Sequence, residues 1–285
     1  MTIFVGTAGW AIGTTAAPSF PADGSSLERY ASVFSAVEIN SSFHRPHRAA
    51  TWHRWREAVP DHFQFSVKLP KTISHEQKLV GCKDAVSLFL DQVHELGDKL
   101  AVLLLQLPPK LIFDARIAEQ FLADLQSRCS TPIVCEPRHS SWFLEDADGL
   151  MRAMGVARVA ADPARHPDAP VPGGWRGLSY YRLHGSPIMY RSSYADRIAD
   201  YAEQVQGQGG KGQSTWCIFD NRASSAAVSD ALDLVSSLRG KEITDVVGHR
   251  SAQLIRKLTV DPGVACLRRL KQKGRASIMP GPSRI

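Results

Sequence analysis

The sequence has little that would place the protein in a membrane or outside the cell. None of its apolar runs approaches the roughly 18 residues that a membrane-spanning helix needs. The stretch Met1–Gly6 lacks the basic start and the apolar run of a signal peptide. The five cysteines are odd in number and never spaced Cys-x-x-Cys, which argues against a disulfide framework and a thiolate zinc site. They are Cys82, Cys129, Cys135, Cys217 and Cys266. We therefore expect a cytoplasmic protein without membrane contact.

The sequence also lacks the short motifs of several large enzyme classes. It contains no Gly-x-Gly-x-x-Gly, no P-loop and no Gly-x-Ser-x-Gly elbow, which disfavours nucleotide binding and serine-hydrolase chemistry. Gly6, Gly9 and Gly13 have the wrong spacing for a dinucleotide fingerprint. Function must therefore be sought in residues that the fold brings together.

The net charge of +6 is confined to the C-terminal tail. Residues 240–285 contain ten Lys or Arg and three Asp or Glu, a charge of +7, which leaves residues 1–239 with 24 basic and 25 acidic residues. The body of the chain thus has no overall electrostatic signature of a nucleic-acid surface. Nucleic acid is a possible partner only through the basic tail, and a solvated appendage is the ordinary alternative for such a tail.

Short apolar runs alternate with helix-period segments along the chain. We expect eight strands at Ile3–Val5, Ala36–Ile39, Phe63–Val67, Leu100–Leu105, Ile133–Cys135, Val156–Ala160, Leu178–Leu183 and Thr215–Phe219. We expect helices at Ser25–Phe34, Ala49–Ala58, Lys83–Leu96, Ala115–Arg128, Leu144–Met154, Tyr194–Gln206 and Ser224–Leu238. This alternation predicts an α/β protein, a single (β/α)₈ TIM barrel, for which a length of 285 residues is ordinary.

Two segments depart from the alternation. Residues Asp162–Arg176 contain four prolines and two glycines, so we expect a loop in place of the sixth helix. Residues 240–285 form a basic C-terminal extension, separate from a barrel domain at 1–239. Within it Leu254–Leu258 and Ala265–Leu270 are candidate short helices, and Gly274–Ile285 is expected to be disordered.

The predicted strands end in polar residues. In a TIM barrel the active site lies at the C-terminal ends of the strands, and residues two apart on a strand point the same way. The polar strand-end residues are Glu38, Asn40, Ser66, Lys68, Gln106, Glu136, Arg138, Asp162, Arg182, His184, Asp220 and Asn221. If they face the barrel axis, acids and bases converge at one end and should form a salt-bridged network. Such a network shifts pKa values in the way that proton-transfer sites require.

We interpret Lys68, Glu136 and His184 as catalytic residues, because each is the last residue before a loop. The expected ligand-binding residues are Trp10, Asn40, His75, Gln106, Arg138, Trp142, Arg182, Tyr190, Asp220 and Asn221. For several of these residues a purely structural role is the alternative to ligand binding. Glu38 and Arg182 suit an architectural ion pair, Asp220 and Asn221 suit a helix cap, and the aromatic residues Trp10, Phe43, Trp142, Tyr190 and Tyr194 suit the core as well as a pocket wall.

A metal site is a weaker possibility. His75, Glu136, Asp162 and His184 are ligand types that divalent ions accept, but their spacing is not diagnostic. His44 and His47 lie three apart in a basic loop, which is not a usual metal pair. The cofactor is therefore left unknown, with a divalent metal possible and not favoured.

An ordered set of motifs resembles one known family. The opening motifs are Gly6-Thr-Ala-Gly9-Trp10, Glu38-Ile-Asn40-Ser-Ser-Phe43, Phe65-Ser-Val-Lys68, Ile73-Ser-His75 and Leu104-Leu-Gln106-Leu-Pro-Pro109. The later ones are Glu136-Pro-Arg138-His-Ser-Ser-Trp142, Arg182-Leu-His184-Gly185 and Phe219-Asp220-Asn221. Together they resemble the YecE-like family, catalogued as domain of unknown function 72. The resemblance implies a barrel related in shape to sugar isomerases, without an established reaction.

The sequence departs from the family pattern in two places. His44 follows Phe43 where the family tends to have Tyr, and Asp220-Asn221 stands where it tends to have two Asn. Asp220 adds a negative charge to the expected pocket. The tail after Gly240 matches nothing in the family.

Three functions remain open. The first is acid–base catalysis on a small polar sugar-like or sugar-phosphate-like ligand. Glu136 or His184 would abstract the proton, Lys68 or Arg138 would stabilise the oxyanion, and Asn40 with Gln106 would orient hydroxyl groups. The second is a metal-dependent phosphoesterase or nuclease. The third is a non-catalytic binding module whose tail contacts nucleic acid. The sequence does not indicate the oligomeric state.

Overall fold

The computed structural model of the protein describes residues 2–208 and 213–240. The chain divides into two units at Ser237 and Leu238, and nearly all of the second unit lies outside the described residues. The predictions for residues 241–285 lie outside the described residues; they are the candidate helices Leu254–Leu258 and Ala265–Leu270 and the disorder of Gly274–Ile285. The boundary between barrel and tail stays a prediction.

The strands form two mostly parallel sheets. The first has the order β1, β10, β9, β7, and the second has the order β2, β3, β4, β5, β6, β8. Every neighbouring pair is parallel except the short antiparallel pair of β6 with β8. The bounds are β1 Thr2–Thr7, β2 Ala36–Ile39, β3 Gln64–Lys68, β4 Leu100–Gln106, β5 Ile133–Glu136, β6 Val156–Arg158, β7 Ala160–Asp162, β8 Gly173–Gly174, β9 Leu178–Leu183 and β10 Ser214–Phe219.

The two sheets meet at β1 and β2. Ala8 and Glu38 form an isolated parallel bridge, and the Gly9 amide donates to the Glu38 carbonyl over 2.8 Å. A side-chain β-carbon on Gly6 would lie only 2.0 Å from the backbone oxygen of Ala36, so only glycine permits this approach of the two strands. The Tyr30 hydroxyl accepts from the Thr7 amide and donates to Ala36 O, which ties the strands together.

The chain also passes from the second sheet to the first between β6 and β7. These strands are separated by Val159 alone, and the Val159 amide donates to Cys135 O of β5 over 2.9 Å. The single strand predicted at Val156–Ala160 is therefore divided between the two sheets.

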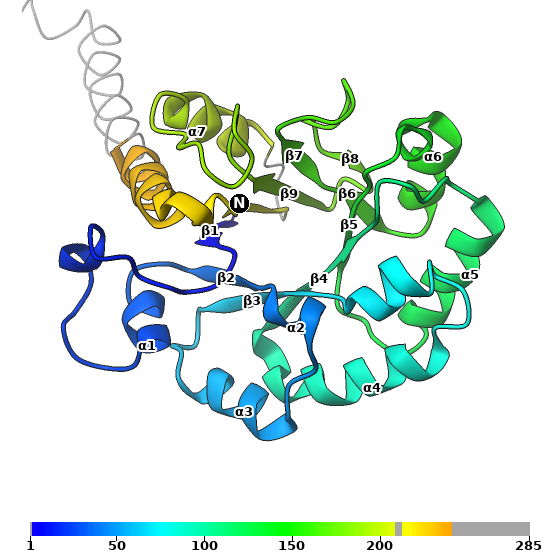
Figure 1. Ribbon diagram of the computed structural model, residues 1–285, viewed down its shortest axis with the longest axis horizontal. Coiled ribbons are helices and arrows are strands. Elements are labelled where there is room, and N and C mark those ends of the chain that lie inside the picture. Colours follow the sequence, from blue (N-terminus) through cyan, green and yellow to red (C-terminus); the bar gives the residue numbers. More distant parts are fainter. Residues whose placement is uncertain (1, 209–212, 241–285) are drawn as a thin grey trace, which may run out of the picture. The chain divides into compact units, whose positions relative to one another are not determined.

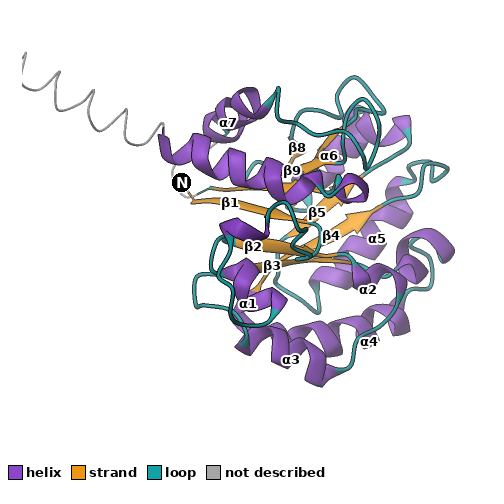
Figure 2. Cartoon of the chain, turned by 60° about the vertical axis from the view of Figure 1, so that its left-hand side comes forward, coloured by secondary structure: helices purple, strands orange, loops and turns teal. Residues whose placement is uncertain are grey.

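Helices surround the strands of this unit (Figure 1), and Figure 2 shows the strands inside and the helices outside. Their bounds are α1 Ser26–Ala31, α2 Ser41–His44, α3 Ala49–Glu57, α4 Lys83–Val93, α5 Ala115–Gln126, α6 Glu145–Ala153, α7 Ile198–Gly207 and a final helix described over 226–240. Local sequence fixes several starts. Ser25 and Glu28 form a reciprocal capping box on α1, and Asp114 accepts from the Ile117 amide at the start of α5.

The predicted absence of a sixth helix is confirmed, because residues 163–177 contain turns, bends and β8 but no helix. Several short elements were not predicted, among them α2 and a π-helical turn at Thr72–Glu76. Between the strands lies a core of apolar side chains that includes Val102, Leu104, Val134, Tyr180 and Trp216. Among the described residues, no helix has the length and apolar character to cross a membrane.

Candidate functional site

Arg182 of β9 is the centre of a buried ionic network. Its guanidinium binds the Glu38 carboxylate of β2 in a bidentate manner, with Nε 2.9 Å from Oε2 and Nη2 2.7 Å from Oε1. Both side chains have no exposed surface. The Tyr180 hydroxyl lies 3.0 Å from Glu38 Oε2 and 2.8 Å from Ser66 Oγ. The Glu38 carboxylate is thus fully occupied, which fits an architectural role.

Glu136, at the end of β5, accepts from four side chains. Arg182 Nη1 contacts its Oε2, Arg138 Nε lies 2.8 Å from Oε1, Gln106 Nε2 lies 3.0 Å from Oε2, and His184 Nε2 lies 3.1 Å from Oε1. Burial opposes ionisation, but the charges of Arg182, Arg138 and His184 hold the pKa of Glu136 well below its usual value. The carboxylate therefore stays ionised, with its oxygens occupied by donors.

His184 lies between two carboxylates. Its Nε2 faces Glu136, and its Nδ1 lies 3.1 Å from Asp220 Oδ2, which also accepts from Arg182 Nη2 over 3.1 Å. Burial opposes ionisation of Asp220, yet its bond to His184 and the charge of Arg182 lower its pKa. Each ring nitrogen of His184 thus lies within hydrogen-bond distance of a different acid.

Lys68, at the end of β3, is the basic group at the edge of this network. Its residue is 8% exposed, and its Nζ lies 4.0 Å from the centre of the Phe43 ring. Among the described residues, no carboxylate lies within 4.0 Å of this ammonium group. Burial and the charge of Arg182 lower the pKa of Lys68 to about 8, although Glu38, Glu136 and Asp220 act against them.

His75 is on the same side as Lys68. Its ring lies 4.9 Å from that of Phe43, edge to face, and its Nδ1 lies 2.9 Å from Ser74 Oγ. Burial, followed by the charges of Lys68 and Arg138, lowers the pKa of His75. Its ring is therefore largely neutral near pH 7, with a lone pair available.

Three other expected residues lie near the network or next to its strands. Gln106 contacts Glu136, as described above. Asn40 follows β2, and its Oδ1 is buried without a hydrogen-bond partner among the described residues. Tyr190 is 42% exposed and lies edge to face with His184 at 5.8 Å.

Other expected residues have structural partners instead. Trp142 is buried and donates through its indole to Leu111 O over 3.0 Å. Asn221 donates through its amide to Ser192 O and to Asp230 Oδ2, which fixes the chain after β10. Trp10 packs edge to face on Trp55, with ring centres 5.1 Å apart.

The proposed metal-ligand set is not assembled. Asp162 pairs with Arg197, while Glu136 is engaged by arginines. Within residues 2–208 and 213–240, no three or more His, Cys, Asp and Glu side chains form a group that could hold a metal ion.

Sequence reasoning missed Tyr180. It lies two residues before Arg182 on β9 and points to the same side, and its hydroxyl completes the environment of Glu38. The same two-residue spacing that linked Arg182 to His184 could have identified it.

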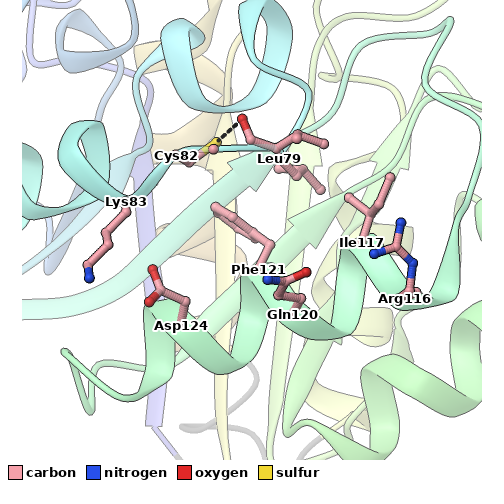
Figure 3. A pocket seen from close by; sticks show the side chains of 10 residues that line it. Leu79, Cys82, Lys83, Arg116, Ile117, Gln120, Phe121 and Asp124 are labelled. Carbon is pink, nitrogen blue, oxygen red and sulfur yellow. Dashed lines mark hydrogen bonds between the residues drawn. The ribbon is translucent and has the colours of Figure 1, made fainter.

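Several cavities bordered by the described residues lie outside the network. One of about 550 Å³ is bordered by residues 79–83 and α5, with the Lys83 and Arg116 side chains toward its two ends (Figure 3). Another, of about 340 Å³, has Phe43, Trp52, Leu88 and Phe89 among its lining. Phe43 thus contributes one ring both to this cavity and to the contact with Lys68.

The lowered pKa of Glu136 predicts an acid-dependent stability. A folded-state pKa below the unfolded value of about 4.3 makes the ionised carboxylate stabilising above that value, and this stabilisation is lost as pH falls toward the folded pKa. Below about pH 5 the free energy of unfolding, measured with urea, should fall less steeply with pH in Glu136→Gln than in the wild type. We expect the two slopes to differ by up to about 1.4 kcal/mol per pH unit. The exposed control Glu119→Gln should keep the wild-type slope. Parallel slopes for Glu136→Gln and the wild type would contradict this account.

Comparison with known proteins identifies relatives that match parts of this chain. The chain is 36% identical to the UPF0759 protein YecE of Escherichia coli K12 over 145 residues, which cover 48% of this chain and about half, 52%, of the relative. It is 27% identical to the UPF0759 protein YunF of Bacillus subtilis over 201 residues, covering 64% of this chain and 70% of the relative.

Solved structures show the same fold. A DUF72 family protein of Enterococcus faecalis superimposes with a TM-score of 0.71 at 21% identity, covering 84% of this chain and 96% of that one. One from Thermotoga maritima gives 0.70 at 22% identity, covering 84% and 100%. The family model described as "Protein of unknown function DUF72" matches residues 4–253. The expectation that the tail after Gly240 matches nothing in the family is therefore wrong for residues 241–253. The chain therefore belongs to the DUF72 family.

Proposed function

We propose that the two sheets together form one closed (β/α)₈ barrel. The bridge of Ala8 with Glu38 joins the sheets on one side, and on the other β6 and β7 continue one another through Val159. Counting β6 and β7 as one strand and leaving out β8 gives eight parallel strands in the order of the chain. In such a barrel the strand ends that carry Lys68, Glu136 and His184 open onto one face.

We propose that this face binds a small polar anion, of sugar or sugar-phosphate type, and converts it by acid–base chemistry. The observation that carries the proposal is that Lys68 Nζ, at the partly exposed edge of the network, faces no carboxylate among the described residues. Every other basic group of the network is paired with an acid. An anionic ligand would supply the missing partner.

The charges of the network agree with this ligand class. The carboxylates of Glu38, Glu136 and Asp220 are hydrogen-bonded by Arg182, Arg138 and His184. Lys68 is left as the basic group of the network with which an anionic ligand would pair, in a setting where an unpaired charge is costly.

The geometry favours a different division of roles from the one that the sequence suggested. Glu136 accepts from four donors and its pKa is lowered, so it is better suited to orient Arg138 and His184 than to abstract a proton. His75 is the better-placed base, because it is only half-buried and its lowered pKa leaves the imidazole neutral near pH 7. In this proposal Lys68 and Arg138 stabilise the oxyanion, while Asn40 and Gln106 orient hydroxyl groups.

The test is proton exchange, which requires no knowledge of the product. Aldoses, ketoses and their phosphates are incubated with the protein in D₂O, and proton NMR follows the loss of the signal next to the carbonyl. We expect exchange to fall at least about 100-fold in Lys68→Met and in His75→Gln. The exposed Lys110→Met is the matched control and should exchange like the wild type. Equal exchange in Lys68→Met and the wild type would remove Lys68 from the mechanism.

The pKa of Lys68 gives a second test through pH. The ammonium form binds anions, and it is lost as pH rises through about 8. We therefore expect the affinity for inorganic phosphate, measured by calorimetry, to fall about tenfold for each pH unit well above that value. In Lys68→Met this fall should be absent, whereas a variant with the wild-type profile would show that another group is responsible.

No specific observation supports either of the two alternative functions. The ligand set His75, Glu136, Asp162 and His184 is not brought together, as described above, and the basic tail lies outside the described residues. Metal-dependent hydrolysis and nucleic-acid binding therefore remain hypotheses from the sequence.

A further inference from the structure

We propose that Lys68 forms an imine with the carbonyl carbon of a small anionic aldehyde or ketone. This inference rests on the proposed function, since it places the ligand at the same strand ends, and it goes further by assigning a covalent step and a carbonyl group to the substrate. It replaces a purely electrostatic role for Lys68 with a nucleophilic one.

The position of the Lys68 side chain is fixed. The residue closes β3 in register with Leu104 of β4, and its carbonyl accepts from Ser42 Oγ of α2 over 2.7 Å. Its stem is buried, and its Nζ lies above the Phe43 ring at 4.0 Å. A nucleophile held in one place meets a bound carbonyl without first losing its conformational freedom.

The nitrogen is also chemically available. A lysine nucleophile must be unprotonated, and burial together with Arg182 holds the pKa of Lys68 at about 8. At about pH 7.5 roughly a quarter of such amines are free, against about a thousandth for an ordinary lysine. The conditions for amine nucleophilicity are therefore met near neutral pH.

Lys99 shows what a buried lysine looks like when it has a structural role. It is equally buried, but its Nζ donates to Pro60 O over 2.9 Å and lies 3.4 Å from Asp61 Oδ1. Lys68 Nζ has neither a carbonyl nor a carboxylate partner of this kind among the described residues. Burial without such a partner distinguishes Lys68 from Lys99.

The step balances with groups already near Lys68. The amine lone pair attacks the carbonyl carbon, the C=O electron pair moves to the oxygen, and His75 carries one N–H proton to that oxygen, which becomes a hydroxyl group. His75 then takes the second N–H proton and delivers it to the hydroxyl, which leaves as water while the nitrogen lone pair forms the C=N bond. One carbonyl and one amine thus give one imine and one water. A protonated imine withdraws electrons from the neighbouring carbon, which makes its C–H bond easier to break.

Formaldehyde tests the amine without any need for ligand recognition. With limiting formaldehyde and dimethylamine–borane at about pH 7.5, peptide mass spectrometry reports the rate of methylation at each lysine. We expect Lys68 to react at least about tenfold faster than the exposed Lys78 and Lys110. The buried Lys99 should react more slowly than either. Methylation of Lys68 no faster than that of Lys110 would overturn the proposal.

Anionic carbonyl compounds test the ligand class. Pyruvate, dihydroxyacetone phosphate and, as a neutral comparison, dihydroxyacetone are each incubated with the full chain and sodium cyanoborohydride. We expect one adduct, located at Lys68, to form at least about tenfold faster with the two anions, and to be absent in Lys68→Met. Arg138→Met should slow this adduct but leave formaldehyde labelling unchanged.

The outcomes separate this inference from the proposed function. Deuterium exchange that depends on Lys68, with no trapped adduct, keeps the acid–base function and overturns the imine. A trapped adduct with no preference for anions overturns the ligand class. An anion-selective adduct without deuterium exchange supports the imine and contradicts the acid–base proposal.

Discussion

Arg182→Met is expected to lower the free energy of unfolding by about 3–5 kcal/mol. The substitution removes the guanidinium that binds Glu38, Glu136 and Asp220, and leaves three carboxylates buried with fewer partners. The loss comes mainly from those unpaired acids, since a buried charge without a partner costs more than the ion pair contributes. Denaturant unfolding, followed by circular dichroism, measures the change.

Two further variants keep this prediction testable if Arg182→Met fails to fold. Arg182→Lys retains the charge but cannot bind Glu38 with two parallel bonds, so we expect an intermediate loss. Arg152→Met removes an arginine that is half-exposed and pairs with Glu145 and Asp148, and it should cost less than about 1 kcal/mol. Similar losses in Arg182→Met and Arg152→Met would show that the buried network contributes little.

Gly6→Ala is expected to destabilise the fold by about 3 kcal/mol or more. The added methyl group would lie 2.0 Å from the Ala36 oxygen, which is backbone and has no alternative rotamer, so β1 and β2 must separate. Their separation would also strain the hydrogen bonds of Tyr30 to Thr7 and Ala36. Thermal unfolding measures the effect.

Gly207→Ala is the matched control for this substitution. Gly207 ends α7, is exposed, and a methyl group there meets no atom of the described residues within 4 Å. Because alanine favours a helix over glycine by up to about 1 kcal/mol, we expect no loss of stability and up to that gain. An unchanged melting temperature in Gly6→Ala would show that β1 and β2 tolerate a wider spacing than the structure has.

Much of the fold is predictable from local patterns. The predicted strands Ala36–Ile39 and Leu178–Leu183 coincide with β2 and β9, because both are short apolar runs between polar segments. The division at Val159 was not predictable, since it depends on the bond to Cys135 on another strand. Four-residue α2 was missed because it is too short to show a helical period.

The sequence predicted which residues form the candidate site, but not the hydrogen bonds that they make. Alternation along the strands identified Glu38, Lys68, Glu136 and His184 as groups that converge. The saturation of Glu136 by four donors depends on strands far apart in sequence, so nothing local signals it. Trp142 shows a different difficulty, because an aromatic residue near a strand end suits a pocket wall and an interior hydrogen bond, such as the one to Leu111 O, equally well.

The network of Arg182 also connects the two sheets through the interior. Arg182 lies on β9 of one sheet, while Glu38 and Glu136 lie on β2 and β5 of the other. An anion that draws Arg138 or His184 away from Glu136 would thus alter how tightly the sheets hold together at the β1–β2 junction. The hydrogen-exchange rates of the Ala8 and Gly9 backbone amides would then change when the anion binds, although these amides do not contact the anion-binding side chains.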